Sequence, residues 1–158
     1  MVNKHSNPSS LKTRVISALI LAPVVLGAIV YGESPFYLMI LLTAGVGIFE
    51  WARMVEPGIK PPLLVTTIFC VVATVAILPD YGLRNSVIAL ITMALTIFVL
   101  ARFFAKAQHP FRLSFGVAYL GLAMMSTLWL RNMEVGGLFI ILLLLVFIWT
   151  TDIAAYFT

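Results

Sequence analysis

Residues 136–158 read GGLFIILLLLVFIWTTDIAAYFT, an apolar run long enough to enter a membrane, with one carboxylate, Asp152, near its far end. A charged side chain at the centre of a membrane helix costs roughly 2.5–3.5 kcal/mol on insertion scales, so an acid in such a run is a candidate functional residue by default. The run reaches Thr158 without a polar tail. We therefore expect the chain to be a fragment, the N-terminal portion of a longer protein.

The composition of the whole chain is that of an integral membrane protein. Hydrophobic residues make up 62% of it and charged residues 10%, whereas about a quarter of the residues of soluble domains are charged. The apolar runs have about the length of helices that cross a core of roughly 30 Å, and they lack the alternation of barrel strands. The sequence therefore predicts an all-α, polytopic helical membrane protein.

Six apolar runs predict six transmembrane helices in this chain. The first run is longer than the apolar part of a signal peptide and has no small-residue cleavage site, so we interpret it as a membrane helix, although Pro23 lies inside it. We expect a cytoplasmic segment at 1–14 and a C-terminally incomplete transmembrane domain at 15–158, with helices at about 15–31, 35–55, 63–78, 87–104, 113–130 and 137–157.

The basic residues predict the orientation, because those of short loops fall mostly on the cytoplasmic side. With these helix limits, Arg84 and Arg131 fall on one side of the membrane, and the other eight of the ten Lys and Arg residues fall on the opposite side. The N-terminus is thus expected in the cytoplasm. Asp152 would then lie about 22 Å along the last helix, about 8 Å inside the cytoplasmic boundary.

The surroundings of Asp152 leave two interpretations open. At helical spacing its neighbours are Ile148, Trp149, Ala155 and Tyr156, and a carboxylate there suits Mg²⁺, which takes one or two carboxylates together with substrate phosphates. Alternatively, Asp152 is a hydrated acid near the helix end, with Trp149 and Tyr156 in the interfacial aromatic belt.

Other polar residues favour structural roles. Glu50 is expected to pair with Arg53, three residues on, although it could instead share a polar cavity with Asp152, as in an ion- or proton-coupled transporter subunit. Cys70 has no partner for an intrachain disulfide, and the histidines lack the neighbours of a metal site. The net charge of +4 is explained by topology, so we expect no nucleic-acid partner, while the basic residues suit anionic lipid headgroups.

Three stretches carry a family resemblance: LKTRVISALILAPVVL at 11–26, FEWARM at 49–54 and FIWTTDIAAYFT at 147–158. Together they resemble the N-terminal half of bacterial phosphatidate cytidylyltransferases, also called CDP-diacylglycerol synthases. The most specific part is Asp152-x-x-Ala155-Tyr156, which in that family is followed by a glycine and a loop rich in lysine.

The resemblance implies a multi-pass enzyme of the bacterial inner membrane that acts in phospholipid biosynthesis. It implies that CTP and phosphatidate react to give CDP-diacylglycerol and pyrophosphate, that Mg²⁺ is required, and that Asp152 serves as a catalytic and metal-binding residue. It also implies that this chain alone is inactive, because the family's further metal-binding acids belong to the C-terminal half. A transporter subunit and a purely structural membrane protein remain alternatives, and a homodimer is left open.

Overall fold

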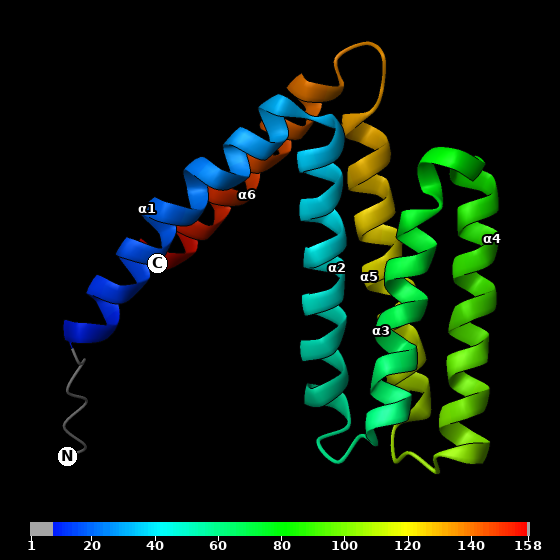
Figure 1. The fold of residues 1–158 in the computed structure, drawn as a ribbon. Helices are drawn as coiled ribbons and strands as arrows, with labels where there is room; N and C mark the ends of the chain where they lie inside the picture. The colour runs from blue at the N-terminus through cyan, green and yellow to red at the C-terminus, as the bar shows by residue number, and fades with distance from the viewer. Residues whose placement is uncertain (1–7, 158) are drawn as a thin grey trace.

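The computed structural model describes the backbone of residues 8–157 and the side chains of residues 20–152, 154 and 155. Within residues 8–157 it contains helices and no strand, which confirms the predicted all-α class (Figure 1). The elements are α1 (Pro8–Tyr31), α2 (Glu33–Val55), α3 (Pro61–Ala76), α4 (Leu78–Val99), the π-helical turn η1 (Leu100–Phe104), α5 (Pro110–Arg131) and α6 (Gly137–Phe157).

Two helices begin earlier than the sequence predicts. α1 begins at Pro8 rather than near residue 15, and proline is favoured in the first helical turn because its missing N–H has no helical acceptor there. α4 begins at Leu78 rather than near residue 87, with Pro79 and Asp80 in its first turn. At Gly82 the backbone leaves the helical region (φ 74°, ψ 168°), a conformation open to glycine, and the helix then restarts.

Helices α2–α5 form a bundle, and α1 and α6 both extend away from it on the same side, where they are together called the arm (Figure 1). The loops at 56–60 and 105–109 lie at one end of the bundle, called here the Lys60 end. The turns that precede α2, α4 and α6 lie at the other, called the Arg131 end. The charge count predicts that the Lys60 end faces the cytoplasm.

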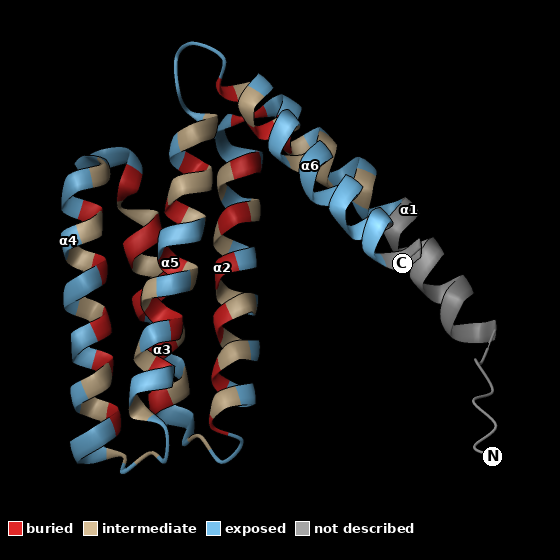
Figure 2. Cartoon of the chain, turned by 180° about the vertical axis from the view of Figure 1, so that it is seen from behind, coloured by how far each residue is buried: buried red, intermediate tan, exposed pale blue. Residues whose placement is uncertain are grey.

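The bundle core follows the helical period. On α2 every fourth residue from Phe36 to Ala52 is buried, which places one continuous stripe against α3 and α5. Figure 2 shows the buried positions of the bundle as stripes facing inward, whereas α6 is mostly exposed. α5 contacts α2, α3, α4 and α6.

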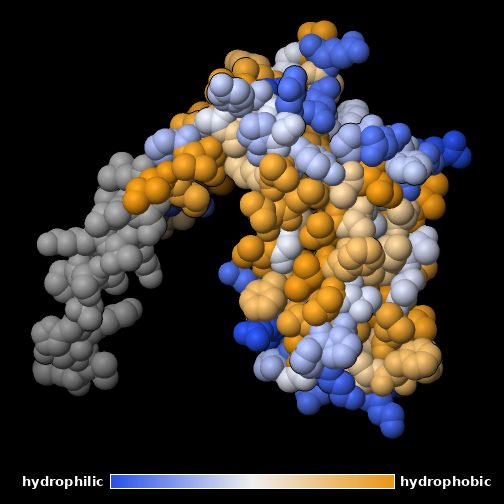
Figure 3. All heavy atoms as spheres, in the orientation of Figure 1, coloured by the Kyte–Doolittle hydropathy of each residue, from blue (hydrophilic) through white to orange (hydrophobic). Residues whose placement is uncertain are grey.

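Three described segments are long and apolar enough to cross a membrane, by length and composition: α2, the continuous stretch Leu78–Phe104, and α5. Shorter apolar stretches lie at Ile20–Tyr31, Pro61–Ala76 and Gly137–Asp152. In Figure 3 hydrophobic residues cover most of the sides of the bundle, and hydrophilic residues gather at its two ends. The distribution is that of a helical membrane protein.

Candidate functional site

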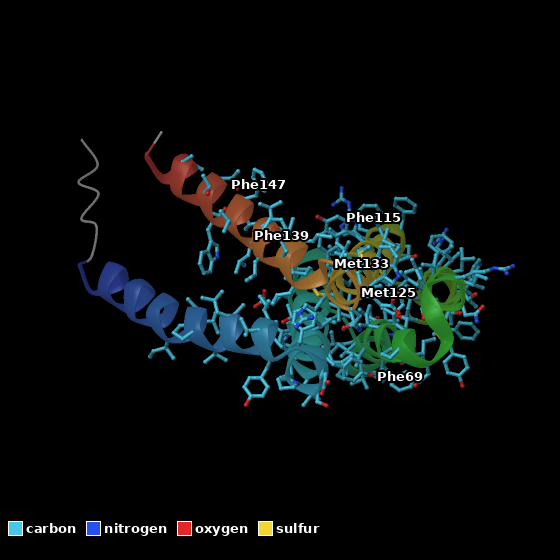
Figure 4. All side chains as sticks on the ribbon, turned by 90° about the horizontal axis from the view of Figure 1, so that it is seen from above. Phe69, Phe115, Met125, Met133, Phe139 and Phe147 are labelled. Carbon is cyan, nitrogen blue, oxygen red and sulfur yellow. The ribbon has the colours of Figure 1, made fainter. Side chains whose placement is uncertain are left out.

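Asp152 lies on the arm, in the part of α6 that has left the bundle. α6 begins against the end of α5, where a side chain at Gly137 would collide with the carbonyl oxygens of Leu130 and Arg131. Ile141 is buried, but every side chain from Val146 to Asp152 is exposed. Seen from above, α1 and α6 separate as they leave the bundle, and Phe139 and Phe147 mark the course of α6 (Figure 4). The carboxylate of Asp152 therefore stands on an uncovered helix.

The polar groups next to Asp152 are already satisfied by their own helix. The hydroxyl of Thr150 donates to the carbonyl oxygen of Val146 at 2.7 Å, and the hydroxyl of Thr151 donates to that of Ile148 at 2.8 Å. The carboxylate of Asp152 accepts no hydrogen bond from, and makes no salt bridge with, any side chain that the structure describes. An acid without a partner on an apolar helix is costly in a membrane, so its charge requires water, a cation or another polar group.

Glu50 does not form the ion pair predicted from the sequence. It is exposed on α2, and no salt bridge joins it to Arg53. The guanidinium of Arg53 instead lies 4.7 Å from the centre of the Phe49 ring, a cation–π geometry that competes with the pair. The C-terminal half of α6 diverges from α2 (Figure 1), so the structure does not bring Glu50 and Asp152 into one cavity.

Glu56, which the sequence did not single out, is the buried acid of the structure. It is 8% exposed, and its two carboxylate oxygens each accept a hydrogen bond of 3.0 Å from a backbone N–H, one of Gln108 and one of His109. These N–H groups precede the first residue of α5, where a negative charge is also favoured by the helix dipole. Glu56 thus joins the two loops of the Lys60 end. Its partners are more than 50 residues away, so no local pattern predicts the contact.

An indole makes a second link between α2 and α5 at the same end. Trp51 Nε1 donates to the carbonyl oxygen of Arg112 at 3.0 Å, and the ring lies directly over Gly116. Phe115 and Tyr119 flank it, each with its ring centre 6.3 Å from that of Trp51. With Glu56, these contacts fix the ends of the helices to which the basic loops are attached.

The described residues do not by themselves form a metal site. No three His, Cys, Asp or Glu residues lie together in the described part of the chain. Asp152 fits as a single oxygen ligand, but a single carboxylate needs further ligands, which substrate phosphates supply in many Mg²⁺ enzymes. The predicted neighbour Tyr156 lies outside the residues whose side chains are described.

Comparison with known proteins adds to this geometry. The profile of the cytidylyltransferase family matches residues 12–158, which include most of α1, all of α2–α6 and Asp152. The chain belongs to the cytidylyltransferase family. This confirms the resemblance seen in the three sequence stretches.

A curated member of the cytidylyltransferase family, the phosphatidate cytidylyltransferase of Bacillus subtilis (strain 168), is 27% identical over 155 residues. The alignment covers 93% of this chain and 57% of the relative, so the chain spans little more than half the length of that protein. No solved structure matches the chain.

Proposed function

We propose that this chain forms a membrane portion of an enzyme of the bacterial inner membrane that transfers the cytidylyl group of CTP to phosphatidate. The observation that carries the proposal is the family match over residues 12–158, together with a carboxylate at Asp152, inside the matched region, that has no partner among the described side chains. The name of the Bacillus subtilis relative supplies the substrate class.

In this reaction a phosphate oxygen of phosphatidate attacks the α-phosphorus of CTP. A new P–O bond forms there, the bond between the α- and β-phosphates breaks, and pyrophosphate leaves with the electron pair. Such transfers depend mainly on positioning and on neutralisation of phosphate charge. We propose that Asp152 contributes one ligand to Mg²⁺, the CTP phosphates and other parts of the enzyme supplying the rest.

The location of Asp152 suits both substrates. α6 runs from the Arg131 end toward the side predicted to be cytoplasmic, where CTP is found. The exposed apolar surface of α6 leaves a lipid substrate free to approach from the bilayer. A transporter that uses Glu50 and Asp152 as one relay is not supported, because the two acids lie on diverging helices.

The test uses the gene product at its encoded length, purified into phospholipid vesicles with labelled CTP and phosphatidate. The unaltered protein is expected to form CDP-diacylglycerol in the presence of Mg²⁺. Asp152→Asn should lower turnover by about 10²–10³-fold, as expected for loss of charge stabilisation in the reaction. Glu50→Gln is the matched control, since it neutralises the other exposed membrane acid and should leave turnover within about twofold.

The outcomes separate the parts of the proposal. If the unaltered protein forms no CDP-diacylglycerol, the assigned reaction is wrong. If it does, and Asp152→Asn turns over at the normal rate, Asp152 has no part in the mechanism. Equal losses in both variants would indicate a general effect of membrane acids on folding rather than a specific site.

A further inference from the structure

Two adjoining hollows open at the Lys60 end, between α3 and η1. One, of about 250 Å³, is mostly apolar and lies along the side of the bundle, while the other, of about 340 Å³, lies between the two loops. Lys60, Leu63 and Ala105 line both hollows, so the two meet. The second reaches the lower part of the range of small-molecule sites, about 300–1,000 Å³.

The backbone at this place is unusual. At the end of η1 the N–H of Ala105 donates to the carbonyl oxygen of Leu100, five residues back, at 2.9 Å, instead of the four residues of an α-helix. In the following loop the N–H of Ala107 donates to the carbonyl oxygen of Ala101, six residues back, at 2.9 Å. Lys106 then has a positive φ of 53°, which is uncommon for a residue with a side chain. π-helical turns and such strained residues gather at functional sites.

The charge of the hollow between the loops is positive. Lys60 and Lys106 lie on opposite loops, both exposed, and both line it. Its one carboxylate, Glu56, makes no salt bridge with either lysine and is held by the N–H groups of Gln108 and His109. Two ammonium groups on opposite sides of a hollow suit a phosphate.

The hollow along the side of the bundle is suited to hydrocarbon. Its walls include Pro62 and Leu63 of α3 and Leu100 and Phe104 of η1, and the side chain of Phe104 is 76% exposed. The hydroxyl of Thr66 donates to the carbonyl oxygen of Pro62 at 2.8 Å, so it offers no unmet donor to the groove. An apolar hollow that opens into a basic one has the shape and polarity to bind a lipid, with one acyl chain in the first and the phosphate headgroup in the second.

We propose that this place binds an anionic phospholipid of the cytoplasmic leaflet, with its phosphate between Lys60 and Lys106 and an acyl chain along Leu63, Leu100 and Phe104. The site lies on the bundle, whereas Asp152 lies on the arm, so it does not rest on the proposed function. It is a site of lipid binding, separate from the reacting groups.

The test measures lipids retained by the purified protein in native mass spectrometry, after exchange into micelles with equal phosphatidylglycerol and phosphatidylcholine. The unaltered protein should retain phosphatidylglycerol preferentially. Replacing both lysines (Lys60→Gln with Lys106→Gln) should weaken retention of phosphatidylglycerol about 30-fold. Each basic residue at an anionic membrane surface contributes about 1 kcal/mol of binding free energy, and two of them correspond to about this factor.

The matched control is Arg102→Gln with Arg112→Gln, which removes the same charge from exposed residues of the same end that line neither hollow. It should leave retention within about twofold, since surface charges away from a binding site contribute little. Phe104→Ala should weaken retention of long-chain phosphatidylglycerol more than that of its dihexanoyl form.

Three results would overturn the proposal: equal retention of the two lipids by the unaltered protein, unchanged retention in the lysine variant, or an equal loss in the arginine control. Competition with inorganic phosphate distinguishes a lipid headgroup from free phosphate as the occupant of the hollow. If inorganic phosphate displaces the lipid at comparable concentration, the hollow is a site for free phosphate and the lipid occupant is wrong. Circular dichroism and thermal melting of each variant confirm that losses occur in folded protein.

Discussion

The guanidinium of Arg131 holds the end of α1, with its Nε donating to the main-chain carbonyl oxygen of Ile29 at 2.8 Å. A second N–H of the same side chain reaches the carbonyl oxygen of Val30 at 3.4 Å. The last carbonyls of a helix lack partners within the helix, and a cation is favoured there by the dipole. Because α1 belongs to the arm and α5 to the bundle, this one side chain joins the two parts.

Arg131→Gln should therefore destabilise the attachment of the arm. The shorter amide leaves the carbonyls of Ile29 and Val30 without their charged donor, and the free energy of unfolding should fall by about 1–3 kcal/mol. Thermal unfolding in detergent micelles measures the change. Arg84→Gln is the control, because Arg84 is exposed near the same end and its removal should change stability by less than about 0.5 kcal/mol.

Glu56→Gln should loosen the Lys60 end. One of the two acceptor oxygens becomes an NH₂ group that faces a backbone N–H, so a buried donor loses its partner and stability should fall by about 1–3 kcal/mol. Hydrogen exchange at the amides of Gln108 and His109 should rise at the same time. Glu50→Gln, at an exposed position on α2, the helix that ends just before Glu56, should change neither quantity. Equal hydrogen exchange in the two variants would contradict the role given to Glu56.

Gly116→Ala should disturb the contact between α2 and α5. The added methyl group would overlap the indole of Trp51, and forcing extra volume into a packed contact costs about 1–3 kcal/mol. The measurements are thermal unfolding and tryptophan fluorescence. Gly27→Ala is the control, because that glycine lies in α1 with no neighbouring atom near the new methyl group, and there alanine should be neutral or stabilising. A stable Gly116→Ala protein with unshifted fluorescence would show that Trp51 can move aside.

Tyr37→Phe should give a smaller loss. The hydroxyl of Tyr37 donates to the carbonyl oxygen of Ala76 at 2.9 Å, joining the start of α2 to the end of α3. Hydrogen bonds between membrane helices contribute about 0.6 kcal/mol on average, so a loss of about 0.5–1.5 kcal/mol is expected. Tyr119→Phe is the control: it removes a hydroxyl from an exposed ring on α5 and should leave the free energy of unfolding unchanged. Equal losses of stability in the two variants would indicate that the hydrogen bond to Ala76 contributes nothing.

The sequence predicted the all-α class correctly, because twenty or so apolar residues in a row leave few other conformations in a membrane. It did not predict how the helices are arranged. The hydrogen bonds of Arg131 to the end of α1 and the burial of Glu56 against Gln108 depend on contacts between residues far apart in the chain. The prediction of an ion pair between Glu50 and Arg53 was wrong. Helical spacing places Arg53 within reach of both Glu50 and Phe49, and its guanidinium lies over the ring of Phe49.

The sequence predicts one residue of the candidate site, Asp152, and its role stays a prediction. Asp152 stood out because it interrupts an apolar run, and the family match covers it. The basic hollow at Lys60 and Lys106 was not predictable as a site. The sequence marks both lysines as residues of loops, but only the π-helical turn and the left-handed backbone at Lys106 bring them to the same opening.

The burial of Cys70 has a practical use for determining topology. It is the one cysteine of the chain and is 3% exposed within α3, so maleimides should react with it slowly in folded protein. Maleimide labelling of a single cysteine introduced at Lys60 or Glu134 could then be measured with little labelling of Cys70. In sealed cells an impermeant reagent should label only position 134, and in inverted vesicles only position 60.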